Sequence, residues 1–140
     1  MIEMVAIEHR QIETIWPRVK DHIQAALSHS KGEISLETIK KRLMDNRSLL
    51  LLACENVVIL ASIVCELVDT DNGRVCNIVT CGGKDSDTWL DEWYNHIVPI
   101  AKDQGCVRIS LNGRKGWEKK LKKYGFEHAY TTLHREIGNE

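Results

Sequence analysis

The stretch Arg74-Val-Cys-Asn-Ile-Val-Thr-Cys-Gly-Gly83 joins a strand pattern to a pair of glycines. Its valines, isoleucine and threonine are typical of a β-strand. The glycines have no Cβ, so the chain can turn sharply there and point backbone N–H groups at an anion. A helical pattern begins at Asp87 or Thr88, and the free N–H groups at its start would serve the same anion. The stretch therefore predicts a strand, a loop and a helix arranged around an anion site.

The chain beyond this loop reads as helix, strand, helix and strand. The first helix has one apolar stripe and ends at Gly105; the stripe consists of Trp89, Leu90, Trp93, Ile97, Ile100 and Ala101. Trp89 and Trp93, at i, i+4 spacing, are expected to be structural. A strand over Cys106–Leu111, a basic helix over Arg114–Lys123 and a last strand over His128–Ile137 follow.

The first half of the chain places its helices before most of its strands. A short strand over Met1–Val5 precedes an apolar stripe of helical spacing over Ile12–Leu27. Pro17 has no N–H, so we expect a kink or a restart near Trp16. A second helix is expected over Ser35–Met44, with its first serine as the N-cap.

The strands in the middle of the chain are expected to form an antiparallel meander. Runs over Ser48–Cys54 and Val57–Val68 are separated only by Glu55-Asn56, a spacing that suits a hairpin. A second turn, Asp69–Gly73, makes Arg74–Cys81 the third strand. A long helical connection then predicts a parallel neighbour. The order β-α-α-β-β-β-α-β-α-β predicts an α/β protein with a mixed sheet, and 140 residues predict one domain over 1–140.

Composition places the chain among ordinary globular proteins. Hydrophobic residues make up 43% and charged residues 28%, and a net charge of −1 argues against a general nucleic-acid binder. Five cysteines without a C-x-x-C spacing predict reduced thiols rather than a metal site, and hence a cytoplasmic protein. The N-terminal residues lack a signal-peptide pattern, and the longest apolar run, Leu49–Cys54, is too short to cross a membrane.

The motif Tyr124-Gly-Phe-Glu127 ends the basic helix just before the last expected strand. Together with the element order, it resembles the end of an acetyltransferase domain of the GCN5-related superfamily. The resemblance implies an acetyltransferase-like mixed sheet, acetyl-CoA as acyl carrier and an amine as acceptor. Gly116-Trp117 looks more narrowly like the small acetyltransferase-like proteins of tailed phages, which would place the protein in a host cytoplasm or a virion.

The resemblance assigns the cofactor site to the stretch around the glycine pair. In the family, the fourth strand contacts the pantetheine, and a loop of pattern Gln/Arg-x-x-Gly-x-Gly/Ala holds the pyrophosphate. By resemblance, the strand contacts would come from Val79, Thr80 and Cys81, and the phosphate loop from Gly82, Gly83, Lys84, Asp85 and Ser86. Asn112 would bond a pantetheine amide and Trp117 would stack on adenine. The alternatives are that Asn112 only forms a turn and that Trp117 is a core anchor.

Three residues depart from the family pattern. Asp85 and Asp87 stand where glycines are expected and add bulk and negative charge, although either side chain could instead cap the following helix. Leu121 occupies the place of the tyrosine that often protonates the departing thiolate, and Tyr124 lies one turn later. Glu66, near the end of the third strand, is the candidate general base, with an ordinary exposed carboxylate as the alternative.

Two functions are compatible with these residues. The first is an acetyl-CoA-dependent N-acyltransferase that uses Glu66 and Tyr124 in catalysis. The second is a non-catalytic binding or virion-associated protein that keeps the fold and requires no cofactor. The basic helix Arg114–Lys123 would contact a cofactor phosphate, an acidic protein surface or a nucleic acid, or would be a solvated face. Cys81 lies beside a helix N-terminus, where a thiol nucleophile is conceivable, although buried packing is more common.

Overall fold

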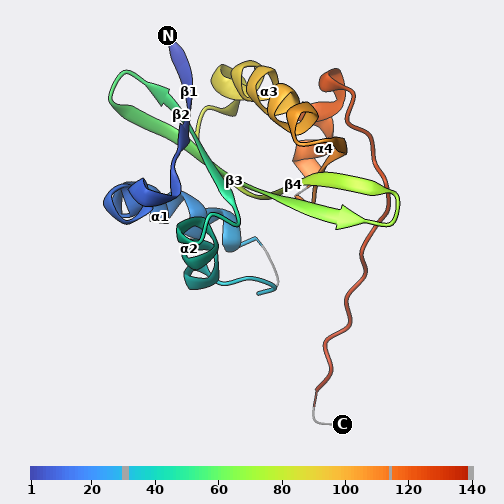
Figure 1. Cartoon of the computed structure of the whole chain (residues 1–140). Helices are drawn as coiled ribbons and strands as arrows, with labels where there is room; N and C mark the ends of the chain where they lie inside the picture. The colour runs from blue at the N-terminus through green and yellow to red at the C-terminus, as the bar shows by residue number, and fades with distance from the viewer. Residues whose placement is uncertain (30–31, 114, 139–140) are drawn as a thin grey trace.

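A computed structural model of the chain describes residues 1–29, 32–113 and 115–138. Five strands form one sheet in the order β1-β2-β3-β4-β5 (Figure 1). Their bounds are β1 Ile2–Ile7, β2 Leu49–Glu55, β3 Val58–Thr70, β4 Gly73–Gly83 and β5 Cys106–Leu111. β1 to β4 pair antiparallel, whereas β4 and β5 pair parallel. The predicted α/β class, the meander and the parallel crossover are therefore confirmed.

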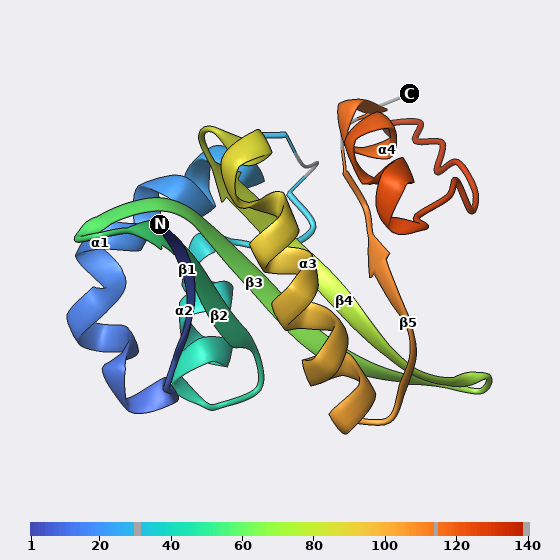
Figure 2. The same ribbon diagram turned by 90° about the horizontal axis from the view of Figure 1, so that it is seen from above.

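Helices cover both faces of the sheet. The first pair, α1 Ile12–Leu27 and α2 Leu36–Met44, lies on one face, and α3 Ser86–Asp103 and α4 Lys115–Leu121 lie on the other (Figures 1 and 2). Short 3₁₀ turns over His9–Gln11 and Lys122–Tyr124 extend α1 and α4. No helix among the described residues is long and apolar enough to span a membrane.

The first two helices test one prediction of a cap and one of a helix restart. Ser35 is the N-cap of α2, and its side chain accepts a hydrogen bond from the Thr38 N–H at 3.2 Å, so that prediction is confirmed. The predicted restart near Trp16 is wrong, because α1 continues through Pro17. Proline removes one helical hydrogen bond, but the buried residues on both sides of it anchor this helix to the sheet. These are Ile12, Trp16, Val19 and Ile23.

Each face of the sheet has its own apolar core. Ile39 and Leu43 of α2 and the buried stripe of α1 pack on Leu50 and Val64. On the opposite face, Trp89 and Trp93 of α3 are only 1% and 3% exposed. Their burial confirms that both tryptophans are structural.

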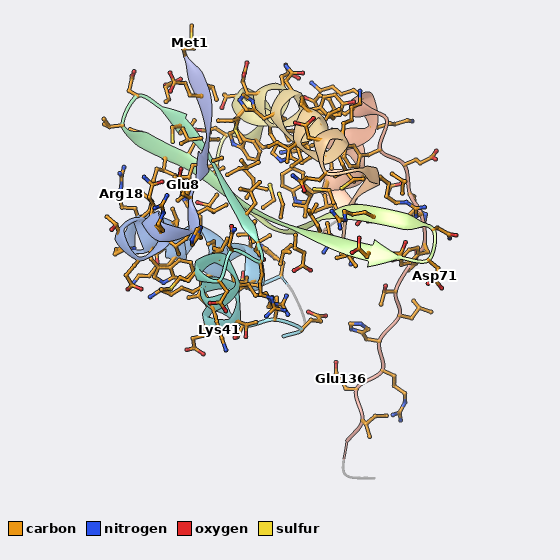
Figure 3. The ribbon with its side chains drawn as sticks, viewed as in Figure 1. Met1, Glu8, Arg18, Lys41, Asp71 and Glu136 are labelled. Carbon is orange, nitrogen blue, oxygen red and sulfur yellow. The ribbon has the colours of Figure 1, made fainter. Side chains whose placement is uncertain are left out.

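The predicted last strand is wrong for the single chain. His128–Ile137 is extended but belongs to neither a strand nor a helix. The segment leaves the α3/α4 layer and projects away from the body, and the labelled Glu136 lies far from the side chains of the sheet and helices (Figure 3). Alternation of apolar and polar residues forms a strand only where a neighbouring strand supplies hydrogen bonds, and none of the five described strands pairs with this segment.

Candidate functional site

β4 continues for five residues beyond the point where its pairing with β5 ends. The pairing of the two strands ends at Ile78 opposite Leu111, and β4 then continues to Gly83 with β3 as its only strand partner in the part of the chain that the structure describes. The β3 register also shifts here, because Val64 pairs with Thr80 and Cys65 with Ile78, which leaves Val79 as an extra residue. Such a bulge twists a strand away from its neighbour and leaves backbone groups without a ladder partner. The second half of β4 is therefore an open strand edge.

The glycine pair lets this open half approach the rest of the molecule closely. A Cβ on Gly82 would lie 2.0 Å from the backbone oxygen of His22 in α1. A Cβ on Gly83, whose φ is +155°, would lie 2.4 Å from the Leu60 carbonyl oxygen. The Lys84 N–H donates to that same carbonyl at 3.1 Å. The glycines are thus required for packing against α1 and β3, in addition to any role in turning the chain.

The start of α3 carries no side-chain cap. α3 begins at Ser86, and its N-cap is Asp85, which adopts a left-handed conformation with φ 56° and makes no capping hydrogen bond. The predictions that α3 begins at Asp87 or Thr88 and that Asp85 or Asp87 caps it are wrong, because the exposed Asp85 side chain makes no such bond and Asp87 lies in the first turn. The first N–H groups of an 18-residue helix consequently remain available to an anion.

Two contacts hold the loop in place. The indole N–H of Trp89 donates to the Lys84 carbonyl oxygen at 2.8 Å, and Lys120 of α4 donates through Nζ to Ser86 Oγ at 2.5 Å. Lys84 itself is exposed. Two ammonium groups and the positive end of α3 therefore surround the loop.

β4 and β5 stop pairing after Ile78 and Leu111, and we call the space between them beyond this point the wedge. Apolar side chains fill the wedge and leave a cavity of about 10 Å³. Its lining residues come from β4, β5, α3 and α4: Ile78, Cys81, Leu90, Trp93, Leu111, Trp117 and Leu121. Trp93 Nε1 beside this cavity and Thr80 Oγ1, which lies opposite Val64 on the α1/α2 face of the sheet, are buried and have no hydrogen-bond partner within the described residues. Because unsatisfied buried polar atoms are costly, they indicate a place where a polar ligand would gain partners.

The thiol of Cys81 lies in this wedge. Burial raises its pKa to about 12, and the nearby Lys120 charge only partly opposes that effect. A thiol that stays protonated at neutral pH is a poor nucleophile. The buried-packing alternative for Cys81 is the one that its surroundings support.

Asn112, just after β5, and Trp117, in α4, lie on the β5 side of the wedge. Asn112 is exposed just after the end of β5. Trp117 is half-buried, lies about 3.1 Å from where a Cβ on Gly113 would stand, and has Lys120 Nζ 5.6 Å from its ring centroid. Because parallel strands end at one edge of the sheet, both residues flank the open half of β4.

On the opposite face of the sheet, four polar side chains form a row across α2, β3, β4 and β5. Arg42 donates to Glu66 at 3.2 Å, Glu66 pairs with Asn77 across the strands, and Ser110 donates to Asn77 at 3.2 Å. The side chains of Glu66 and Arg42 are 23% and 33% exposed. This Arg42–Ser110 row lies beside the base of the wedge, next to Ile78 and Leu111.

A larger hollow of about 370 Å³ lies between the end of α1 and the start of α2. It is lined by Gln24, Leu27, Gly32, Ile34, Ser35, Leu36 and Glu37. Val79, the bulged residue of β4, packs against the same apolar cluster as Leu27, Ile34 and Leu36. The hollow therefore lies on the α1/α2 face of the sheet, the face that Val79 also contacts.

Tyr124 lies away from Glu66, in the α3/α4 layer. Its hydroxyl donates a short hydrogen bond to the Asp91 carboxylate, and its ring stacks on Tyr94 at a centroid distance of 4.8 Å. Burial, followed by the bond to Asp91, raises the Tyr124 pKa to about 12, so the hydroxyl stays protonated at neutral pH. The two residues predicted to be catalytic thus lie on opposite faces of the sheet.

The structure adds residues that sequence reasoning missed. His22, expected on a helix surface, is half-buried and lies 3.2 Å through Nδ1 from the buried Ser62 hydroxyl. Burial lowers the His22 pKa, and Lys84 contributes to that shift while Asp21 opposes it. Arg42 and Ser110 also join the site from distant parts of the sequence. No local spacing signals these contacts, since strand pairing and helix docking create them.

Comparison with known proteins gives matches in structure alone. No family model and no curated protein sequence matches the chain. A predicted acetyltransferase with acetyl-CoA from Clostridium acetobutylicum is similar at 19% identity and a TM-score of 0.70, covering 97% of this chain and 96% of that one. A glucosamine-6-phosphate N-acetyltransferase from Arabidopsis thaliana is similar at 10% identity and a TM-score of 0.66, covering 99% of both chains.

An aminoglycoside acetyltransferase from an uncultured soil metagenomic sample, in complex with sisomicin, is similar at 9% identity. Its TM-score is 0.69, and the match covers 98% of this chain and 97% of that one. The chain therefore has the fold of the GCN5-related N-acetyltransferases, as the Tyr124–Glu127 motif and the element order predicted. The narrower resemblance to phage proteins stays a prediction.

Proposed function

We propose that this protein is an acetyl-CoA-dependent N-acyltransferase with an amine acceptor. The observation that carries the proposal is the open half of β4, Val79–Gly83, leading directly into the uncapped N-terminus of α3. A free strand edge offers hydrogen bonds to an extended amide chain, and the helix start offers them to phosphate. A structural neighbour with acetyl-CoA supports the choice of cofactor.

The residues present fit such a cofactor. Backbone groups of Val79, Thr80 and Cys81 would hold the pantetheine, whose amides would also give Trp93 Nε1 the partner that it lacks among the described residues. The pyrophosphate would lie at the loop formed by Gly82, Gly83, Lys84, Asp85 and Ser86. Asn112 and Trp117 would border it from β5 and α4. Acetyl-CoA supplies the activated acyl group, and the chain supplies orientation and positive charge.

Glu66 is the proposed acceptor of the amine proton. It lies on the α2 face, opposite Asn77 of β4, and a hydrogen bond from Arg42 holds its side chain. An amine entering from the hollow beside Val79 would approach the open half of β4 from this face. The protonated hydroxyl of Tyr124 is the proposed second catalytic group, although it would first have to leave Asp91.

A non-catalytic binding or virion-associated protein is the second candidate function. The observation in its favour is the engagement of Tyr124 by Asp91, together with the burial of Leu121 at the place of the family's usual tyrosine. In that case the exposed lysines of α4 and its 3₁₀ extension would contact a protein or nucleic acid. Arg114, the first residue of the predicted basic helix, lies outside the described residues.

Calorimetric titration with acetyl-CoA tests the proposal. We expect the wild-type chain to bind, and the Asp85→Gly, Asp87→Gly double variant to bind more tightly because two negative charges leave the phosphate loop. An Asp71→Gly, Asp103→Gly variant removes the same charge far from the loop and serves as the control. Absence of binding by the wild type at about 1 mM acetyl-CoA, with binding gained by the loop variant, would reject the enzyme in favour of the second candidate.

A further inference from the structure

The wedge between β4 and β5 is nearly full. Its cavity of about 10 Å³ is the size of one water molecule, whereas sites for cofactors and other small molecules usually measure about 300–1,000 Å³. An extended ligand reaches the backbone of the open half of β4 only after side chains that fill the wedge have moved. The closed wedge therefore raises the question of which element opens it.

α4 is the element around the wedge that is held least firmly. α3 has 18 residues and buries a long apolar stripe, which includes Leu90 and Trp93 at the wedge. α4 has seven residues and brings Trp117 and Leu121 into the wedge, and Trp117 is only half-buried. Because less apolar surface would leave the core, a shift of α4 costs less free energy than a shift of α3.

Glycines stand on both sides of this helix. Gly113 precedes α4, and Gly125 follows its 3₁₀ extension Lys122–Tyr124. Gly125 adopts the left-handed conformation with φ 89°, and Gly113 is exposed. Residues at the ends of an element absorb the backbone rotations when that element moves as a unit. α4 and its extension therefore have the form of a lid, and we use that name for Lys115–Tyr124.

Asp91 of α3 contacts two neighbouring residues of the lid. Its carboxylate accepts a hydrogen bond from the Tyr124 hydroxyl and lies 3.9 Å from Lys123 Nζ. The same Lys123 Nζ lies 5.1 Å from the centroid of the Tyr124 ring, which stacks on Tyr94 of α3. A charge-assisted hydrogen bond is about twice as strong as a neutral one, and the exposed ion pair adds less. One carboxylate thus provides both polar contacts at this end of the lid.

We propose that the lid Lys115–Tyr124 closes the wedge and that Asp91 holds the lid shut. The Asp91 side chain is 76% exposed, so water can replace its contacts when the lid opens. A further polar contact, from Lys120 to Ser86 Oγ, lies at the phosphate loop, where the phosphate of a ligand would compete for the lysine. The identity of that ligand rests on the proposed function, whereas the closed lid and its contact with Asp91 do not.

Hydrogen exchange on the full chain without ligand measures the opening of the lid. Asp91→Ala removes the hydrogen bond and the ion pair, and should speed amide exchange in residues 116–124 about tenfold, because exchange through local opening follows the opening equilibrium. Tyr124→Phe keeps the ring and loses the hydroxyl, so a smaller increase is expected. Asp103→Ala removes the same charge at the far end of α3 and is the control. Exchange in β2 and β3 should not change, which excludes general destabilisation.

Stopped-flow mixing with acetyl-CoA tests whether the lid controls entry. The apparent association rate scales with the open fraction, so it should also rise about tenfold in Asp91→Ala. Asp103→Ala, with the same change in net charge, should bind at the rate of the wild type.

Two outcomes would overturn the lid. Exchange in residues 116–124 is the same in Asp91→Ala and the wild type, or exchange is faster while the association rate of acetyl-CoA stays unchanged. A third outcome concerns the proposed function instead. Faster exchange in Asp91→Ala, with no binding of acetyl-CoA by any of the proteins, would support the lid and reject this cofactor.

Discussion

The two halves of β4 differ in one edge only. From Arg74 to Ile78 the strand pairs with β3 on one side and β5 on the other, whereas from Val79 to Gly83 it pairs with β3 alone among the described strands. The first half belongs to the interior of a sheet. The second half has free backbone groups, the orphaned Thr80 hydroxyl and the uncapped start of α3 within a few residues. One strand thus provides both the scaffold and the candidate site, and the position where β5 ends separates the two.

The largest expected effect concerns Trp89, whose indole N–H bonds the Lys84 carbonyl oxygen just after the open half of β4. Trp89→Ala should lower the free energy of unfolding by about 3–5 kcal/mol, because a fully buried aromatic side chain is removed. Trp89→Phe keeps most of the apolar contact and loses only the bond to the Lys84 carbonyl, so about 1–2 kcal/mol is expected. Chemical denaturation measures both. Equal losses in the two variants would show that the indole N–H, rather than its burial, dominates.

The next effect tests the close approach of β4 to α1. Gly82→Ala places a Cβ against the His22 backbone oxygen, and should destabilise the fold by about 1–3 kcal/mol. Gly116→Ala is the matched control, since nothing lies within 4 Å of that position and alanine favours a helix. Thermal unfolding of the two variants should therefore shift in opposite directions. An unchanged melting temperature for Gly82→Ala would contradict the close approach.

A third prediction concerns ligand binding at the open half, and depends on the proposed function. Lys84→Ala should weaken acetyl-CoA binding about tenfold, or about 1.4 kcal/mol, because one positive charge leaves the phosphate loop. The melting temperature should stay the same, since Lys84 is exposed. Lys102→Ala, at the other end of α3, removes the same charge as a control. Equal weakening by both would indicate long-range attraction instead of a site at the loop.

The smallest expected effect is a pH dependence through His22, which lies beneath the open half. Its pKa is lowered in the folded state, so folding favours the neutral ring. The unfolded chain therefore binds more protons below its usual pKa of about 6.5, and stability should fall as pH decreases through that value toward the folded pKa. His22→Gln should lose this slope while keeping a polar group near Ser62. Parallel pH profiles for the two proteins would contradict the assignment.

Sequence reasoning predicted the fold well where the signals are local. The short turns at Glu55-Asn56 and after Thr70 set the meander, and the helical stripe after the glycine pair set the parallel crossover. Ser35 was recognised as a cap because the pattern of a serine before a helix needs no tertiary contact. The prediction of a last strand is wrong for the opposite reason: His128–Ile137 has the local pattern of a strand, but a strand also needs a hydrogen-bonded neighbour, and none of the described strands pairs with this segment.

For the candidate site, the sequence predicted which residues take part but not how they are arranged in space. The family resemblance named the residues from Val79 to Ser86, and in the structure Val79–Gly83 form an open strand edge that leads into the start of α3 at Ser86. Two features of that edge had no sequence signal: the bulge at Val79 and the point where β5 stops pairing. The expectation that an aspartate would cap α3 failed because the left-handed Asp85 makes no capping bond.

By itself, the sequence determined the elements, their order and the chemistry available near the glycine pair, because periodicity, turn residues and charge act over a few residues. Only the tertiary structure decided which groups meet. Pairing between strands brought Glu66 and Asn77 together, docking of α2 added Arg42, and packing of α4 on α3 directed Tyr124 to Asp91. These contacts join residues 11 to 33 positions apart, and their energies depend on distances that exist only after the sheet and helices have assembled.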